Sequence, residues 1–392
     1  MHQRIETIDV MRGITLFLML FVNDLFTSNV PVWLIHTKAD FDGMGLADWV
    51  FPGFLFMVGI SVPFAINSRF KKGHSVIKVI QHVLVRTISL LFIGVLMLNV
   101  SRLNPELTGM NKNSWAIFMY LSVFLVWNNY NNLKLHYRLI LKGIGFAGLF
   151  FLLLIFRSGT ESEPNWLITG WWGILGLIGW GYFVTALTYV FVRDKLFVTG
   201  IIWLFFVGLN ILSQLNLLYF LNFLKPVFGV LISGNTPSIV LAGLFFSLLF
   251  RKFQSENYYK FIGIGTLLGL TVLAAGFILR NWFIVSKIYG TPSWAMICNG
   301  ISILLFVLLF LIIDIFKMRG WSTIFKPAGR NSLTTYLAPD VLYYSIWLFN
   351  LPVLFYKQLE SPLFVVLGSV VWAFTMIGFA KILSQIGIRL KL

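Results

Sequence analysis

Apolar runs long enough to cross a membrane recur along almost the whole of this 392-residue chain, separated only by short polar loops. A helix needs about 20 apolar residues to span a bilayer. Hydrophobic residues make up 58% of the chain and charged residues only 11%, whereas soluble domains average about 25% charged residues. The sequence therefore predicts an all-α, polytopic integral membrane bundle that forms one domain over residues 1–392.

Hydropathy divides the chain into twelve expected spans, and any number from ten to twelve fits the pattern. The expected spans are 10–26, 48–66, 82–100, 114–128, 138–156, 171–192, 197–214, 234–250, 261–280, 294–316, 331–349 and 363–384. The first run is interrupted by Asn23 and Asp24 and lacks a small-residue cleavage site, so it is expected to be an uncleaved span.

The basic residues predict the orientation of these spans. With a cytoplasmic N-terminus, eight of the 30 Lys and Arg residues fall outside, namely Lys38, Arg102, Lys112, Arg157, Lys225, Arg280, Lys287 and Lys357. Because cytoplasmic loops carry the excess of Lys and Arg, we expect both termini to be cytoplasmic. The same distribution accounts for the net charge of +16 without a nucleic-acid partner.

The densest polar stretch, residues 23–48, joins the first two spans and contains Asn23, His36 and Asp48. Polar groups are costly near lipid, so this density indicates a site. An imidazole takes up and releases protons at ordinary pH, and a nearby carboxylate such as Asp48 fixes its tautomer. Two simpler interpretations stay open. Asp48 suits the N-cap position of the second span as well as it suits a catalytic role. His36 can be an ordinary solvated residue of the loop.

Arg12 and Asn23 lie at opposite ends of the first span. They are eleven residues apart, which is about 16 Å along a helix. A cation on the inside and an amide on the outside suit a long ligand with a cytoplasmic anionic end, whose carbonyl oxygen the Asn23 amide would hold. The alternatives are a snorkelling role for Arg12 and an interhelical hydrogen bond for Asn23.

A second polar segment, Lys326–Ser332, leads into the eleventh span. It places Lys326, Arg330 and Asn331 at a cytoplasmic helix start, where free N–H groups attract phosphate. Tyr336 adds a polar group one turn further on. The segment lacks the glycine spacing of a P-loop, and a positive-inside loop is the alternative interpretation. No metal is expected, because the other histidines are predicted to lie away from His36 and no HExxH pattern occurs.

Several short motifs resemble the heparan-α-glucosaminide N-acetyltransferase family of transmembrane acetyltransferases, in the order in which that family has them. They are Thr7–Gly13 (TIDVMRG), Phe21–Asn23 (FVN), His36, Leu46–Pro52 (LADWVFP), Phe54–Ser61 (FLFMVGIS), Thr291–Trp294 (TPSW), Ile312–Asp314 (IID) and Gly329–Leu333 (GRNSL) with Tyr336. Together they cover about a third of the chain. The loop after His36 departs from the family pattern, since it is two residues longer and has Phe41 in place of tryptophan.

This resemblance implies acetyl transfer from cytoplasmic acetyl-CoA to the amine or hydroxyl of a sugar or glycan across the membrane. His36 is the implied catalytic residue, supported by Asn23 and Asp48. Binding of acetyl-CoA is expected at the cytoplasmic end, from Arg12, Lys326, Arg330, Asn331 and Tyr336. A multi-pass protein of a bacterial inner membrane is expected, and a homo-oligomer is left open.

Two other functions fit the same sequence. The first is a secondary transporter of a sugar or amino sugar, with Asp24, Asp48 and Asp314 as ion-coupling carboxylates. The second is a flippase or scaffold for glycan precursors. Neither predicts that the protein binds coenzyme A, so binding of that nucleotide distinguishes both from the acetyltransferase.

Overall fold

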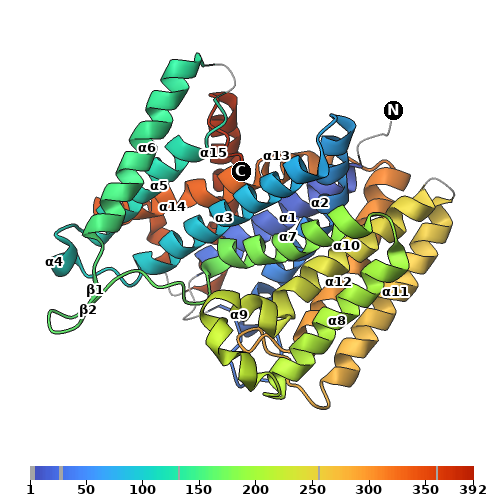
Figure 1. Cartoon of the computed structure of the whole chain (residues 1–392). Helices are drawn as coiled ribbons and strands as arrows, with labels where there is room; N and C mark the ends of the chain where they lie inside the picture. Colours follow the sequence, from blue (N-terminus) through green and yellow to red (C-terminus); the bar gives the residue numbers. More distant parts are fainter. Residues whose placement is uncertain (1–4, 26–29, 131–132, 255–256, 359–360) are drawn as a thin grey trace.

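The computed structural model describes residues 5–25, 30–130, 133–254, 257–358 and 361–392. Its long helices lie side by side in a tilted bundle, with α5 and α6 at one edge and α8 and α11 at the other (Figure 1). The single two-stranded ribbon in the described part of the chain, β1 (Ser158–Gly159) with β2 (Pro164–Asn165), closes a loop between helices.

The elements follow the expected spans closely. In the first half they are α1 (Glu6–Asp24), η1 (Val32–Leu34), α2 (Leu46–Lys71), α3 (Val76–Val100), α4 (Pro105–Thr108), α5 (Lys112–Trp127), α6 (Leu135–Ile155), α7 (Gly173–Val192) and α8 (Leu196–Gln214). In the second half they are η2 (Tyr219–Leu224), α9 (Lys225–Ser233), α10 (Asn235–Gln254), α11 (Tyr258–Leu279), α12 (Pro292–Phe310), η3 (Leu311–Ile315), η4 (Trp321–Ile324), α13 (Lys326–Arg330), α14 (Ser332–Leu348), η5 (Pro352–Gln358) and α15 (Pro362–Gln385).

Each of the twelve expected spans coincides with a long helix, and the all-α membrane architecture is confirmed. Nine stretches of the described chain are long and apolar enough to cross a membrane. The other three expected spans fall short for identifiable reasons: α5 and α14 have only 16 and 17 residues, and α1 carries Glu6, Asp9, Arg12 and Asp24 within its 19 residues. Phe26, the expected end of the first span, lies outside the described residues.

The centre of the bundle is built around α2, which contacts α1, α7, α10 and α12. Its buried side chains belong to two apolar clusters, one shared with α1, α3 and α5 and the other with α7, α10 and α12. In this arrangement Asp24, at the end of α1, and Asp48, near the start of α2, are fully buried in the bundle.

Two glycines allow α2 and α10 to pack closely. A Cβ atom added to Gly59 would lie 1.9 Å from the carbonyl oxygen of Val240, and one added to Gly243 would lie 2.0 Å from that of Phe56. Backbone atoms cannot move aside as a flexible side chain would. Close helix approach through small residues is the usual way in which membrane helices pack.

We expect Gly59→Val to destabilise the protein by about 3 kcal/mol or more, because overpacking at a rigid contact forces the helices apart. Thermal unfolding of the purified protein in detergent measures the loss. Gly263→Ala in α11 is the matched control, since its Cβ would meet no atom within 4 Å. Equal melting temperatures for the two variants would contradict the tight α2–α10 contact.

Candidate functional site

His36 and Asp48 form a close pair at one end of the bundle. The Nδ1 atom of His36 lies 2.7 Å from Oδ1 of Asp48. The imidazole is 48% exposed, whereas the carboxylate is 1% exposed. A carboxylate at Nδ1 favours the tautomer in which Nδ1 carries the proton, and this leaves Nε2 without one.

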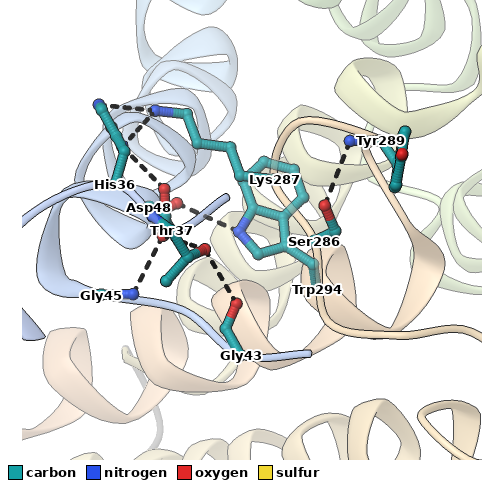
Figure 2. Close-up of polar contacts among 9 residues, drawn as sticks. All are labelled: His36, Thr37, Gly43, Gly45, Asp48, Ser286, Lys287, Tyr289 and Trp294. Atoms are coloured by element: carbon teal, nitrogen blue, oxygen red, sulfur yellow. Dashed lines mark hydrogen bonds and ion pairs between the residues drawn. The ribbon is translucent and has the colours of Figure 1, made fainter. Parts of the chain in front are cut away.

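The second carboxylate oxygen of Asp48 anchors the loop that carries His36 (Figure 2). Oδ2 accepts hydrogen bonds from the backbone N–H and the hydroxyl of Thr37, at 3.1 and 3.0 Å, and from the N–H of Gly45 at 3.0 Å. Helix α2 begins at Leu46, so the N-cap is Gly45 and the N-cap interpretation of Asp48 is wrong. Asp48 instead closes the capping box from the third helical position while pairing with His36.

Lys287, from the loop between α11 and α12, completes this polar cluster. Its Nζ atom lies 3.1 Å from Nδ1 and 3.2 Å from Nε2 of His36. Burial lowers the pKa of Lys287 below its ordinary value, and the Asp48 carboxylate opposes that shift. Trp294 supports the cluster from α12, because its indole N–H donates to the Asp48 carbonyl at 3.2 Å.

The structure does not bring Asn23 into this cluster. Its side chain is exposed near the end of α1, and among the described residues no hydrogen bond joins it to His36. The neighbouring Asp24 is fully buried and accepts from the Tyr356 hydroxyl at 2.6 Å, with Nζ of Lys357 at 2.7 Å. Asp24 therefore ties α1 to the segment after α14.

A cavity of about 460 Å³ lies toward the other end of α1 and α2. Its mouth is strongly basic, with a lining that includes Arg12, Arg69, Lys72, Arg86, Arg330 and Lys391 as well as His74 and His82. Among the described residues that line it, none is acidic. Its inner part is apolar and includes Leu16, Met19, Phe54, Leu90 and Ile178.

Four of the five residues predicted to bind a nucleotide line this cavity: Arg12, Arg330, Asn331 and Tyr336. Asn331 and Ser332 begin α14, so the start of that helix opens onto the cavity. The fifth residue, Lys326, does not line it. Lys326 starts α13 and forms an ion pair with Glu6 of α1.

Four other cavity residues are not among the predicted nucleotide ligands, because their charges were taken only as indicators of span orientation. Arg69 and Lys72, the C-cap residue of α2, are three residues apart, and His82 and Arg86 are four apart on α3. Such spacings place side chains on one face of a helix. The spacing of these basic residues could therefore have predicted the cavity. The contact between Lys287 and His36 could not have been predicted in this way, because it joins residues 251 positions apart.

The basic cavity and the His36–Asp48 pair lie toward opposite ends of α2, which packs against α1. On α1, Arg12, Leu16 and Met19 line the cavity, and Asn23 follows at helical spacing. On α2 the innermost lining residue is Phe54, six residues from Asp48, or about 9 Å along the helix. The cavity therefore ends at Met19 and Phe54 and does not reach His36 in this structure.

Comparison with known proteins gives two findings. Over 96 residues the chain is 32% identical to heparan-α-glucosaminide N-acetyltransferase from Mus musculus and from Homo sapiens. This match covers 24% of the chain and only 14% of each relative, so it extends over about a seventh of their length.

A family model gives the broader match. The model described as a domain of unknown function, DUF5009, matches residues 4–213, which is more than half of the 392-residue chain. It includes both the His36–Asp48 pair and the α2–α3 side of the basic cavity. The protein belongs to the DUF5009 family.

Proposed function

We propose that this protein is a transmembrane acyltransferase that moves an acetyl group from cytoplasmic acetyl-CoA to the amine or hydroxyl of a sugar or glycan on the opposite side. One observation carries the proposal: a basic cavity, whose described lining has no acidic side chain, and a histidine–aspartate pair lie toward opposite ends of α2. The partial identity to two N-acetyltransferases supports the same reaction class.

The cavity suits the donor. Coenzyme A carries phosphates at one end and a long, weakly polar arm with the thioester at the other. Six cations and the start of α14 at the cavity mouth would hold the phosphates. The apolar inner part, with Leu16, Met19 and Phe54, would receive the arm and direct the thioester toward His36.

The opposite end supplies the acid–base chemistry. Nε2 of His36 would take the proton of the acceptor amine as its nitrogen adds to the thioester carbonyl carbon. The C–S bond then breaks, and the coenzyme A thiolate takes up the proton to leave as the thiol. A route in which Nε2 itself carries the acetyl group uses the same residues. Either route requires the cavity to extend past Met19 and Phe54, so both side chains must turn aside when the donor binds.

The transporter alternative depends on Asp24, Asp48 and Asp314. Asp24 is held by Tyr356 and Lys357, Asp48 by His36 and Thr37, and Asp314 by the backbone N–H of Thr7 at 3.1 Å. These contacts account for each carboxylate without a transported ion. We therefore keep the acyltransferase as the proposed function.

The proposed function is tested with protein reconstituted in lipid nanodiscs, supplied with acetyl-CoA labelled in the acetyl group and with glucosamine as acceptor. We expect saturable binding of acetyl-CoA and labelled N-acetylglucosamine as product. Absence of coenzyme A binding, together with gradient-driven sugar uptake in proteoliposomes, would instead establish the transporter.

Asp48→Asn is expected to lower the rate of transfer by about 100-fold or more. An amide that turns its oxygen to the three donors at Oδ2 turns its NH2 to Nδ1 of His36, which favours the tautomer with the proton on Nε2. Loss of the charged hydrogen bonds should also lower stability by about 1–3 kcal/mol. Initial rates and thermal unfolding measure the two effects. Asp40→Asn, in an exposed position of the same loop, should leave both unchanged; a matching loss there would trace the effect to the loop in general.

A further inference from the structure

Lys287 is held beside His36 by a rigid pair of loops. The Ser286 hydroxyl donates to the Ala39 carbonyl at 2.7 Å, and the Gly43 N–H donates to the Val285 carbonyl at 3.0 Å. Asp42 accepts from the Val285 N–H at 2.8 Å and pairs with Arg280 at 2.9 Å. The loop after α11 is thereby fastened to the loop that carries His36, and the position of Lys287 follows from the backbone.

The groups around the Lys287 ammonium are few. It faces the His36 imidazole from one loop and the Asp48 carboxylate from α2, and the Cys298 thiol of α12 lies near enough to interact electrostatically. Asp48 is thus one carboxylate shared by two groups that can each carry a positive charge.

We infer that Lys287 is a further residue of the acyl-transfer site, whose ammonium stabilises the negative charge on the acetyl oxygen. This inference rests on the proposed function. A nucleophile that gives its proton to Nε2 is one bond from the carbonyl carbon under attack. An ammonium 3.2 Å from Nε2 would then be the nearest described cation to the carbonyl oxygen on which negative charge develops.

This assignment gives Lys287 the oxygen-stabilising role that the sequence suggested for Asn23. As the acceptor nitrogen forms its bond to the carbonyl carbon, the C=O electron pair moves onto oxygen. The Lys287 ammonium donates a hydrogen bond to that oxygen while His36 holds the proton. When the C–S bond breaks, the pair returns to C=O, the thiolate receives the proton from His36, and Lys287 remains charged throughout.

The test compares Lys287→Gln and Lys287→Arg with the wild-type protein, using acetyl-CoA and glucosamine in nanodiscs. Lys287→Gln should lower kcat by about 100- to 1000-fold, the usual loss when an oxyanion donor is removed, with little change in the KM for acetyl-CoA. Lys287→Arg should recover part of kcat, because the guanidinium can also donate a hydrogen bond to the oxygen.

Lys38→Gln is the matched control, since Lys38 is exposed in the loop that carries His36, and it should behave as wild type. A Lys287→Gln variant with wild-type kcat would overturn the role of Lys287 alone. Equal losses of kcat in Lys287→Gln and Lys287→Arg, with lowered melting temperatures in both, would overturn it in favour of a structural role. A wild-type protein that binds acetyl-CoA without transferring acetyl would instead overturn the proposed function and, with it, this inference.

Discussion

His36→Ala is expected to abolish acetyl transfer while leaving the binding of acetyl-CoA intact. Removal of a general base lowers rates by about 100- to 10,000-fold, and loss of an acyl-carrying nitrogen would lower them at least as much. The basic mouth of the cavity lies at the opposite end of α1 and α2, so the phosphates of the donor would keep their contacts. Transfer of labelled acetyl measures the first effect, and calorimetric titration with coenzyme A measures the second.

The matched control is His136→Ala, because His136 lies exposed on α6, away from both sites. It should transfer acetyl at the wild-type rate. Turnover by His36→Ala within about threefold of wild type would exclude both acid–base and acyl-carrier roles for His36. Loss of coenzyme A binding in that variant would show that the two ends of the bundle do not act separately.

The same protein can distinguish the two chemical routes. Mixing wild type with acetyl-CoA, without an acceptor, should release coenzyme A in a burst equal to the amount of protein only if the imidazole carries the acetyl group. Without that burst, the acceptor must be present before the C–S bond breaks, and His36 acts as a base.

The fold was predictable because bilayer thickness restricts what an apolar run can become. Every expected span coincides with a helix, within a few residues at most ends. The predicted start of α2 was less accurate. Asp48 is a residue type that is common at N-caps, but here it closes the capping box from the third position of the helix. Which of two neighbouring positions caps a helix depends on where the preceding loop turns, and composition does not specify that turn.

The site was predictable only where its parts are close in sequence. His36 and Asp48 are twelve residues apart, and one dense polar loop revealed both. Lys287 reaches His36 because hydrogen bonds fasten two distant loops, and such tertiary pairing leaves no mark in a single sequence. Lys326 was predicted to bind phosphate because it is a cation near a helix start. The structure pairs it instead with Glu6, which is distant in sequence.

The largest expected effect on donor binding comes from replacing Arg69 and Arg86 together with glutamine. Both line the cavity from neighbouring helices, and the Nε of Arg86 is buried without a hydrogen-bond partner among the described residues, as a group awaiting a ligand would be. A charge-assisted hydrogen bond contributes about 1.5–3 kcal/mol. Losing two should weaken acetyl-CoA binding by about 100-fold or more.

The binding defect should leave the chemistry itself unaffected. At saturating acetyl-CoA the double variant should approach the wild-type kcat, because contacts to the phosphates are equal in the ground and transition states. Added salt should weaken the binding of acetyl-CoA to wild type more steeply than its binding to the variant. The reason is that salt screens charge–charge attraction, and the variant has two fewer cations to attract the phosphates. Lys71→Gln, one position from Lys72 but outside the cavity lining, serves as the matched control. Wild-type affinity in the double variant would place the nucleotide elsewhere and separate the basic cavity from acyl transfer.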